Sequence, residues 1–361
     1  MSDSRRGPLI IQVASGREWR GGQHQVLLLA RGLAARGIDA STVTGKGTEL
    51  ARRLASAGLP VEPVRWSAGA DPRVALHLVR RLRHPAILHV HDSHAHLLAD
   101  AATRFRDAPI VVTRRVTLPI RHPRRYRRAA AAIAISDAVR EELLRAGVEP
   151  GRIHCIPDAI DPGDSTPPDA AGLAPDSDPG GPLVVCIAAL TAEKGIDTLL
   201  DAAALLHQRA PAVRWRVIGD GPERAMLEAH RARHQLEDVV ELRRSVESAA
   251  TAFHRADLVV QPSRSEGLGS AVLQALALGV PVVAADVGGL PDALAHGGGV
   301  LVPADSPREL AAAVERLLGD AVEYRRLSTA GRAAADFFSL DRLVNATIAV
   351  YRSLAPFPGA T

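Results

Sequence analysis

A single carboxylate beside a helix start is the feature of this sequence that most suggests chemistry. Glu266 lies on a loop between an apolar strand-like run at 257–261 and a run with helical periodicity at 270–278. Backbone N–H groups at 268–271 would lack partners within that helix, so together with the helix dipole they would favour an anion such as phosphate. A carboxylate repels phosphate but accepts hydrogen bonds from sugar hydroxyls. The loop and the helix together predict a site for a nucleotide sugar.

A second candidate is Lys194, which together with Lys46 makes up all the lysine in the chain. It lies between an apolar run at 183–189 and a helical run at 196–208, so it too follows a strand. An ammonium group at that point can hold a diphosphate and stabilise the negative charge that develops when a nucleotide leaves. An exposed loop lysine without a ligand is the alternative that this residue alone leaves open.

The first half of the chain contributes a histidine and a pair of glycines. His91 ends a strand-like run at 86–91, which places it at the carboxyl end of that strand. Because neither an HExxH pattern nor a cysteine partner accompanies it, we expect it to hydrogen-bond a ligand rather than to bind zinc. Gly21 and Gly22 open the first helix and allow a ligand to approach the backbone closely, although a simple tight turn explains them equally well.

The sequence lacks the characteristic motifs of several enzyme classes. Arg224 stands where a dinucleotide fingerprint starting at Gly219 needs its third glycine, and neither a GxxxxGK[ST] loop nor a GxSxG turn is present. An Asp-Ser-Asp triplet at 176–178 matches a pattern that holds a metal in many enzymes, but it lies in a Pro- and Gly-rich segment, so we interpret it as coincidence. Cys155 and Cys186 lack the spacing of a zinc motif. We therefore expect no metal and no cofactor.

The elements that must position these residues alternate between strand and helix. A strand at 8–14, a glycine-rich loop and a helical stripe ending near Gly37 come first, and Ser136 is expected to cap a helix at 137–146. Further strands are predicted at 86–91, 109–113, 131–136, 183–189, 214–218, 239–243, 257–261 and 281–285, with helices at 196–208, 222–233 and 270–278. This alternation predicts parallel sheets and an α/β fold.

The length and the position of a Pro- and Gly-rich stretch predict two domains. We expect an N-terminal Rossmann-like domain at 1–165 that binds the acceptor, a linker at 166–182, and a second Rossmann-like domain at 183–335 that binds the nucleotide sugar. A C-terminal helix at 336–361 is expected to pack back toward the first domain. Since ligands of doubly wound sheets bind beyond the carboxyl ends of the strands, the expected site is the cleft between the domains.

Basic charge is concentrated in the first half of the chain. Residues 1–165 hold 26 Lys and Arg against 16 Asp and Glu, whereas residues 166–361 hold 18 against 24. Nine arginines lie at 104–128, where a solvated basic face is the alternative to an anionic partner. The candidates to contact an anionic acceptor or an acidic membrane surface are Arg114, Arg115, Arg124 and Arg125. Stacking aromatic residues are nearly absent there, which argues against nucleic acid.

No apolar run approaches the ~20 residues that a membrane span needs. The apolar run near the N-terminus is short and leads directly into a glycine-rich loop, which is typical of a first strand and not of a signal peptide. We therefore expect a cytoplasmic protein, attached at most peripherally to the inner membrane.

Motifs along nearly the whole chain resemble the family 4 glycosyltransferases, which have the GT-B fold of two Rossmann-like domains facing across a cleft. The resemblance rests on the order, spacing and glycine placement of the segments WRGGQHQVLLLARGL, AAIAISDAVREELLRAGVEPGRIHCIPDAID, TAEKGIDTLLDAAALL, WRVIGDGPERAML and PSRSEGLGSAVLQALALGVPVVAADVGGLPDAL. It implies that Glu266, the first acid of an EX7E motif, binds the donor sugar and that Lys194 binds the diphosphate. It further implies that His91 lies near the transferred sugar and that the donor is lined by Gly21, Gly22, Gly267, Leu268, Gly269 and Ser270.

Two positions depart from the family's pattern. Gln274 replaces the second acid of EX7E, where it can still accept a ribose hydroxyl at a cost of about 1 kcal/mol. Ala189 replaces the arginine that usually precedes the phosphate lysine by five residues. With these departures the sequence leaves open a protein of reduced activity or a non-catalytic subunit that binds a sugar nucleotide.

The activity that the resemblance implies is that of a retaining hexosyltransferase. Such an enzyme moves a sugar from a nucleoside diphosphate donor to an acceptor hydroxyl without a metal. The basic segment at 104–128 then suggests an acceptor in a cell-envelope glycan, such as lipopolysaccharide, or in a glycolipid. A nucleotide-sugar epimerase of the same fold is a further alternative, which would need no acceptor.

Overall fold

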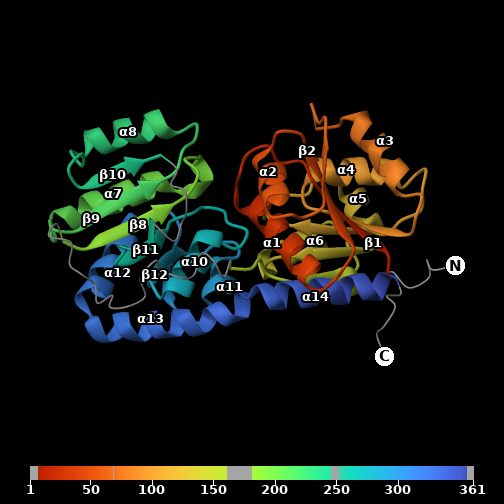
Figure 1. The fold of residues 1–361 in the computed structure, drawn as a ribbon. Coiled ribbons are helices and arrows are strands. Elements are labelled where there is room, and N and C mark those ends of the chain that lie inside the picture. Colours follow the sequence, from red (N-terminus) through yellow and green to blue (C-terminus); the bar gives the residue numbers. More distant parts are fainter. Residues whose placement is uncertain (1–6, 68, 161–180, 245–251, 254, 356–361) are drawn as a thin grey trace. The chain divides into compact units, whose positions relative to one another are not determined.

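The computed structural model describes residues 7–67, 69–160, 181–244, 252–253 and 255–355. Contacts between residues divide the chain into two compact units (Figure 1). Unit 1 combines residues 1–159 with residues 340–361, and unit 2 consists of residues 160–339. Of the expected linker at 166–182, all but positions 181 and 182 lie outside the described residues.

Unit 1 is built on a parallel sheet that has seven strands among its described residues. The spatial order is β3-β2-β1-β4-β5-β6-β7, so the direction in which the chain crosses the sheet reverses between β1 and β4. The strands are β1 (Leu9–Ala14), β2 (Ala40–Gly45), β3 (Val61–Val64), β4 (Ala86–Val90), β5 (Ile110–Arg114), β6 (Ala131–Ala134) and β7 (Ile153–Cys155). The central strands β1, β4, β5 and β6 are almost entirely buried, as expected of a parallel sheet covered on both faces.

The helices of unit 1 connect consecutive strands, and one more arrives from the end of the chain. They are α1 (Gly21–Ala35), α2 (Glu49–Ser56), α3 (Pro72–Arg81), α4 (Ser93–Ala102), α5 (Pro123–Arg128), α6 (Asp137–Arg145) and α14 (Leu340–Leu354). Helix α14 packs on α1, where Leu29 and Leu33 share one core with Val344 and Tyr351 (Figure 1). Unit 1 therefore completes its core with residues that follow all of unit 2 in the sequence.

Unit 2 is built on a second parallel sheet, with six strands in the part of the chain that the structure describes. Their order is β10-β9-β8-β11-β12-β13, so the reversal here lies between β8 and β11. The strands are β8 (Leu183–Ile187), β9 (Arg214–Ile218), β10 (Val240–Arg243), β11 (Leu258–Gln261), β12 (Val282–Ala285) and β13 (Gly299–Val302).

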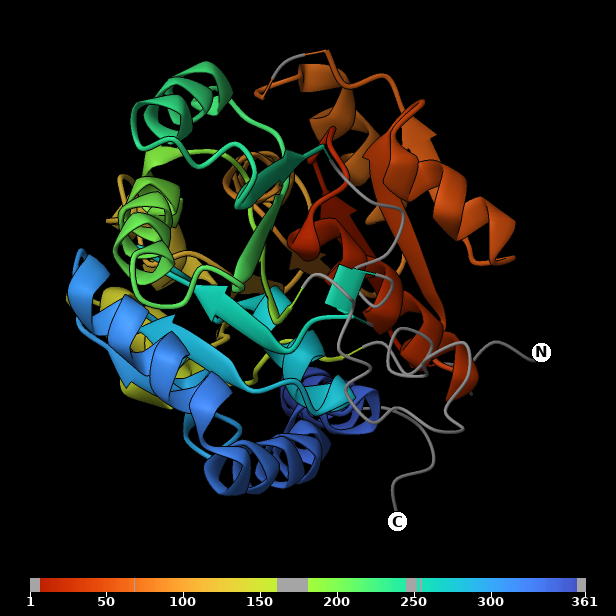
Figure 2. The ribbon, with the colours of Figure 1, turned by 90° about the vertical axis from the view of Figure 1, so that its left-hand side faces the viewer.

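The helices of unit 2 cover its sheet in two sets. They are α7 (Ile196–His207), α8 (Arg224–Arg233), α10 (Ser270–Leu278), α11 (Leu290–Leu294), α12 (Pro307–Gly319) and α13 (Ala321–Ala335). Helix α7 packs against α8 and α12, whereas α10 packs against α13. Figure 2 shows α7 and α8, both in green, side by side in unit 2. One core cluster of this unit joins α7 and α12 to the sheet and includes the fully buried Trp215.

The strands and helices that the sequence predicted are present, with shifted ends. Strand β4 ends at Val90 and not at 91, β8 ends at Ile187 and not at 189, and α8 begins at Arg224 and not at 222. The expected N-cap is confirmed, because the Ser136 hydroxyl accepts a hydrogen bond from the backbone N–H of Val139. Strands β2, β3, β7 and β13 were not predicted. None of the helices among the described residues is both long and apolar enough to span a bilayer.

Candidate functional site

Both sheets place their ligand-binding candidates at the point where the strand order reverses. In a parallel sheet the loops beyond the carboxyl ends of the two strands at that point diverge and leave a crevice for a ligand. In unit 2 these are the loops after β8 and β11, which carry Lys194 and Glu266. In unit 1 they are the loops after β1 and β4, where Ser15 and His91 lie.

In unit 2 the two predicted residues meet directly. The Lys194 ammonium donates to the Glu266 carboxylate with an Nζ to Oε2 distance of 2.7 Å, although 72 residues separate them in sequence. Their side chains are 20% and 15% exposed, so the pair is largely shielded but open to a ligand on one side. The sequence predicted each residue but not their contact.

Two polar side chains that were not predicted hold the Glu266 carboxylate in place. The Ser263 hydroxyl lies 3.3 Å from Glu266 Oε2, and the Gln261 amide donates to Ser263 at 2.9 Å and to Oε2 at 3.4 Å. Both Gln261 and Ser263 are buried. Oxygen Oε2 is therefore the anchored atom, and Oε1 of the carboxylate is the one left to a ligand.

Glycines let the backbone around Glu266 pack tightly. Gly288 has a φ of +56°, and a Cβ there would lie 2.0 Å from the Glu266 carbonyl oxygen. The N–H of Gly289 donates to the same oxygen at 3.0 Å. Gly195 has a φ of +62°, and a Cβ there would lie 2.1 Å from the Pro262 carbonyl oxygen, so the loops after β8 and β11 are in direct contact. These glycines fix the two loops that carry the ammonium and the carboxylate.

The start of α10 has the geometry of an anion site. Gly269 precedes the helix with a φ of +90°, and no side chain caps its first N–H groups. The helix has nine residues, so its dipole adds positive potential at this end. Ser270 is exposed, whereas Gly267 and Leu268 are buried beneath it. Gln274 lies one turn further along the helix and is partly buried.

Two arginines of unit 2, Arg224 and Arg264, are held by contacts within its own loops. Arg264, on the loop after β11, is committed to Asp197 and Asp305 at 2.7 and 2.6 Å, and this pairing raises its pKa. Arg224, which breaks the glycine pattern, donates to the Gly219 carbonyl at 2.6 Å and pairs with an aspartate of the same loop. Both arginines support loops of unit 2.

In unit 1, His91 belongs to a buried polar group. Its Nδ1 accepts from Arg115 at 3.3 Å, and because a guanidinium only donates, the ring proton is on Nε2, which donates to Gln12 at 3.1 Å. The pKa of His91 lies well below its usual range, because the ring is buried and because His89 and Arg115 lie beside it. His91 is therefore neutral, with one defined tautomer.

The Arg115 side chain links this histidine to a buried carboxylate. Its Nε donates to Asp158 at 2.9 Å, and burial raises the pKa of Asp158 although the guanidinium opposes the rise. The segment that holds Asp158 is fixed by Gln25 of α1, whose amide donates to the Ala159 carbonyl at 2.7 Å and accepts from the Ala159 N–H at 2.8 Å. Arg115 thus stands between a neutral imidazole and a carboxylate.

The glycine pair at the start of α1 borders the same group. A Cβ on Gly22 would lie 3.8 Å from Cδ of Arg115, and the first N–H groups of α1 have no side-chain cap. Opposite, Ser15 is tied to Asp92, whose carboxylate accepts from the Ser15 N–H at 2.7 Å and also caps α4. The structure therefore brings Gly22 and His91 together within unit 1.

The arginines predicted for an acceptor or a membrane do not form one group. Arg114 is buried and donates to the Tyr126 hydroxyl and to the Leu118 carbonyl. Its predicted contact with a membrane surface is therefore wrong. Arg115 is held by His91 and Asp158 and is largely buried, so it does not contact a membrane surface either. Arg124 is exposed and Arg125 is partly buried, both on α5.

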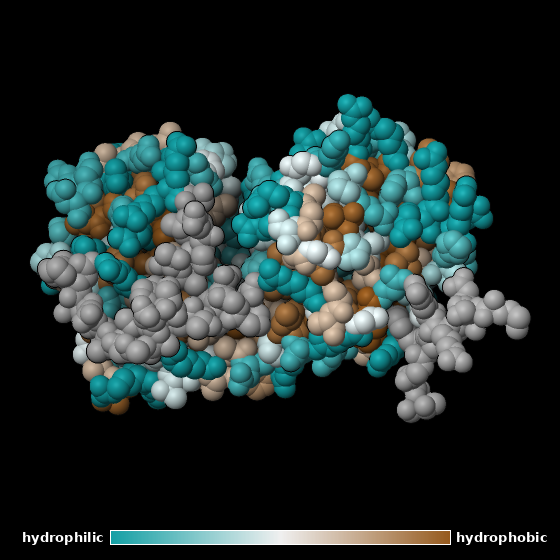
Figure 3. Space-filling model, viewed as in Figure 1, coloured by the Kyte–Doolittle hydropathy of each residue, from teal (hydrophilic) through white to brown (hydrophobic). Residues whose placement is uncertain are grey.

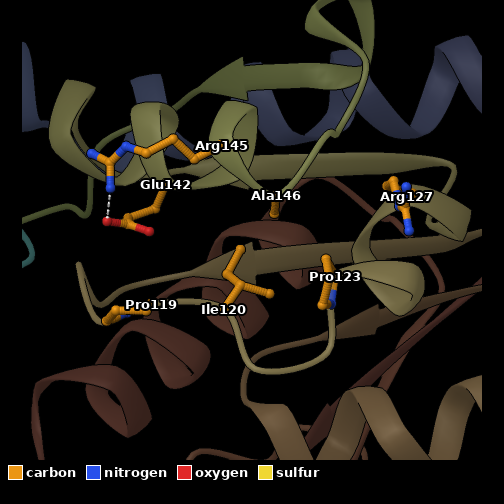
Figure 4. A pocket seen from close by; sticks show the side chains of 7 residues that line it. All are labelled: Pro119, Ile120, Pro123, Arg127, Glu142, Arg145 and Ala146. Carbon is orange, nitrogen blue, oxygen red and sulfur yellow. Dashed lines mark hydrogen bonds and ion pairs between the residues drawn. The ribbon is translucent and has the colours of Figure 1, made fainter.

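A pocket of about 370 Å³ lies beside α5 and α6 (Figure 4). Its wall includes an ion pair between Glu142 and Arg145. The lining residues come from the loop after β5, from α5 and from α6, and they are Pro119, Ile120, Pro123, Arg127, Glu142, Arg145 and Ala146. Val116 and Leu118, on the same loop, are exposed. This surface combines positive charge with apolar side chains.

The sequence did not indicate the hydrogen-bond partners of the predicted site residues. Gln12, Asp158, Gln261 and Ser263 gave no signal, since each is a single polar residue whose role depends on a contact with a distant loop. Arg115 did have a signal, because it follows a strand directly, as His91 does. It was instead grouped with the basic cluster.

Comparison with known sequences finds two family profiles, each of which matches one half of the chain. The profile described as Glycosyltransferase Family 4 matches residues 19–164, and the profile described as Glycosyl transferases group 1 matches residues 174–334. An alpha-D-kanosaminyltransferase of Streptomyces kanamyceticus is 31% identical over 68% of this chain and 67% of its own length. A D-inositol 3-phosphate glycosyltransferase of Jonesia denitrificans is 34% identical over 62% of this chain.

The chain spans only about half the length of some of these relatives. The aligned part covers 57% of the Jonesia denitrificans protein and 48% of a D-inositol 3-phosphate glycosyltransferase of Segniliparus rotundus. Among solved structures, that of Anabaena Alr3699/HepE in complex with UDP-glucose has a TM-score of 0.82 at 20% identity, covering 96% of this chain and all of the other. This similarity shows the fold, which is GT-B.

Proposed function

The chain belongs to the family 4 glycosyltransferases, and we propose that it transfers a sugar from a nucleoside diphosphate sugar to a hydroxyl group of an acceptor. The observation that carries this proposal is the contact of Lys194 with Glu266 at 2.7 Å beside the uncapped start of α10. It puts an ammonium for phosphate, a carboxylate for sugar hydroxyls and free N–H groups at one edge of one sheet. All three belong to unit 2, so unit 2 is the donor-binding unit of this proposal.

The donor half of the reaction is assigned to these groups. Lys194 and the first N–H groups of α10 bind the diphosphate and stabilise the charge that it gains as the sugar bond breaks. Glu266 accepts hydrogen bonds from the sugar through Oε1, while Ser263 and Gln261 keep its other oxygen in place. Gln274 contributes a neutral acceptor for a ribose hydroxyl.

The proposed reaction retains the configuration of the sugar and uses neither a protein nucleophile nor a metal. The departing diphosphate takes the proton of the acceptor hydroxyl, so no general base is needed. His91 suits this scheme, because its Nδ1 is held by Arg115 and its pKa is low. In this proposal His91 does not remove a proton, and its Nε2–H exchanges the hydrogen bond to Gln12 for one to the transferred sugar when the donor binds.

For the acceptor we propose a glycan or lipid of the cell envelope that is reached at an anionic membrane surface. Helix α5 carries exposed arginines, and the loop that leads into it carries the exposed apolar Val116 and Leu118. Such a mixture favours the interface of an acidic bilayer. Each basic residue near such a surface contributes about 1 kcal/mol. Peripheral attachment through unit 1 is part of this proposal.

The test is release of a nucleoside diphosphate by the purified chain. UDP-, GDP- and ADP-sugars are offered singly, with and without a membrane extract as a source of acceptor. Release that depends on the extract supports the transferase. No release with any donor, despite nucleotide binding, supports a non-catalytic subunit instead, for which Ala189 and Gln274 are the motivating residues.

A change of the sugar without any release of nucleotide would indicate an epimerase.

Glu315→Gln serves as the control variant, because its exposed carboxylate pairs with Arg209 at the surface of unit 2. That variant is expected to release nucleotide at the wild-type rate.

A further inference from the structure

A cluster of three side chains on the outer layer of unit 2 has the composition of a transition-metal site. Asp201 extends from α7, and His230 and His234 come from the last turn of α8 and the residue that caps it. One ligand atom from each side chain lies within 4.8 Å of those of the other two. Among the residues that the structure describes, this is the group of three or more His, Cys, Asp or Glu side chains that converge in this way.

The geometry brings both imidazoles to the same carboxylate oxygen. His230 Nε2 lies 2.7 Å and His234 Nε2 lies 3.4 Å from Asp201 Oδ1, and the two rings stack with their centroids 5.0 Å apart. Zinc binds nitrogen and oxygen at about 2.0–2.1 Å, so ligand atoms of a tetrahedral site lie about 3.3 Å apart. The His234 distance already has this value, and the His230 distance needs to open by about 0.6 Å to reach it.

The surroundings favour a cation. The two histidines are four residues apart, which places them on one face of α8, and they occupy the end of the helix where the dipole is negative. Asp201 adds a full negative charge. The neighbouring Arg231 is directed elsewhere, since it donates to the Val240 carbonyl at 3.0 Å. Figure 3 shows mostly hydrophilic surface where α8 lies in Figure 1. The side chains of Asp201 and His234 are partly exposed, so an ion can reach them from solvent.

We propose that Asp201, His230 and His234 form a binding site for one divalent transition-metal ion, with zinc as the preferred ion. Two imidazoles and one carboxylate suit zinc and its neighbours, whereas magnesium and calcium prefer oxygen ligands alone. Solvent completes the coordination, because the side chains of Asp201 and His234 are 39% and 41% exposed. The ion links α7 to α8 and stabilises the outer layer of unit 2. It takes no part in the donor chemistry, since none of its ligands belongs to the group around Glu266.

The first test measures zinc binding by the full chain, freed of any histidine tag, by titration calorimetry without donor. We expect one ion per chain that an excess of magnesium does not displace. We expect zinc binding to weaken by more than about 100-fold in each of the variants His230→Gln, His234→Gln and Asp201→Asn. Loss of a residue that only hydrogen-bonds a metal ligand weakens binding by about 10- to 100-fold, so a larger effect indicates a direct ligand. His84→Gln and Asp238→Asn are the matched controls, because both side chains are exposed outside the cluster, and they are expected to bind as the wild type does.

A second measurement needs no variant. Cobalt added to the wild-type chain is expected to give the visible absorption of four- or five-coordinate nitrogen and oxygen ligation, and zinc is expected to abolish it. Zinc is also expected to raise Tm, because it binds the folded chain and not the unfolded one. Absence of zinc binding by the wild type overturns the proposal. So does binding that persists in any of the three ligand variants, or that is lost equally in the two controls.

Discussion

The contact between Lys194 and Glu266 predicts opposite effects of Glu266→Gln on binding and on turnover. In the free protein the carboxylate holds the ammonium at 2.7 Å, and this contact competes with a diphosphate for the charge of Lys194. A hydrogen bond between charged groups contributes about 1.5–3 kcal/mol, which is roughly 10- to 150-fold in an equilibrium constant. Glu266→Gln weakens that competing bond and removes a charge that repels phosphate. We therefore expect it to bind the bare nucleoside diphosphate more tightly, by up to this factor.

Turnover is expected to change in the other direction. The neutral amide of Glu266→Gln is a weaker acceptor for sugar hydroxyls, so kcat/KM for the donor should fall by about 10- to 150-fold, the same range of energy. Lys194→Met gives the contrasting pattern, because it removes the ligand of the diphosphate. It should weaken binding of the nucleotide and lower kcat/KM together.

The assay pairs calorimetry, with whichever of UDP, GDP or ADP binds the wild type, with release of that nucleotide from its sugar. Glu315→Gln is the control for the loss of one carboxylate of unit 2. If Glu266→Gln weakens nucleotide binding as Lys194→Met does, the carboxylate does not compete with the diphosphate for Lys194. If Glu266→Gln leaves kcat/KM within about threefold of the wild-type value, the carboxylate makes no contact that matters in the transition state.

Three further predictions rest on other contacts. Gly288→Ala places a Cβ 2.0 Å from the Glu266 carbonyl oxygen, so it should lower both donor turnover and the free energy of unfolding measured in urea. Gly37 has a similar φ but nothing within 4 Å of its Cβ position, so Gly37→Ala should lower the free energy of unfolding only by the about 1–2 kcal/mol of a left-handed residue. Burial, with Arg115 nearby, lowers the pKa of His89 to about 3, so the folded chain binds fewer protons than the unfolded chain between pH 3 and 6.5. The free energy of unfolding should therefore drop by about 2 kcal/mol from pH 7.5 to pH 5 on account of this residue, and urea titrations of His89→Gln should lack that share of the drop. Arg124→Gln should reduce sedimentation with phosphatidylglycerol vesicles by about fivefold, while Arg233→Gln, equally exposed but on α8, should not change it; equal effects would point to general charge attraction.

The sequence predicted best what local apolar patterns determine. The buried runs of β1, β4, β8 and β11 and the stripes of α1 and α10 are visible because burial imposes a period on one short segment. Strand β3 was missed since its residues are only half-buried and include Pro63, and β2 because it mixes hydroxyl residues with apolar ones. Such strands are recognisable only from the sheet they join.

The same distinction applies to the candidate sites. Lys194 and Glu266 were predicted because each lies on a loop between an apolar strand and a helix, which is a local signal. The partnership of Arg115 with Asp158 spans 43 residues and depends on how β5, β6 and β7 align in the sheet. The cluster of Asp201, His230 and His234 likewise depends on the packing of two helices. Contacts of this kind follow from tertiary structure and have no counterpart in local spacing.

The arrival of α14 in unit 1 has a consequence for synthesis of the chain on the ribosome. Residues 1–159 emerge first, but Val344, Ile348 and Tyr351, which close the core over α1, emerge only after the whole of unit 2. At about 5–20 residues per second, translating residues 160–339 takes roughly 10–40 s. During that interval the nascent unit 1 exposes the apolar face of α1, and His89 lacks the Tyr351 hydroxyl, its partner at 2.5 Å. Unit 2 can thus fold while unit 1 is still incomplete, and the apolar surface of the nascent unit 1 is prone to aggregation until α14 has been made.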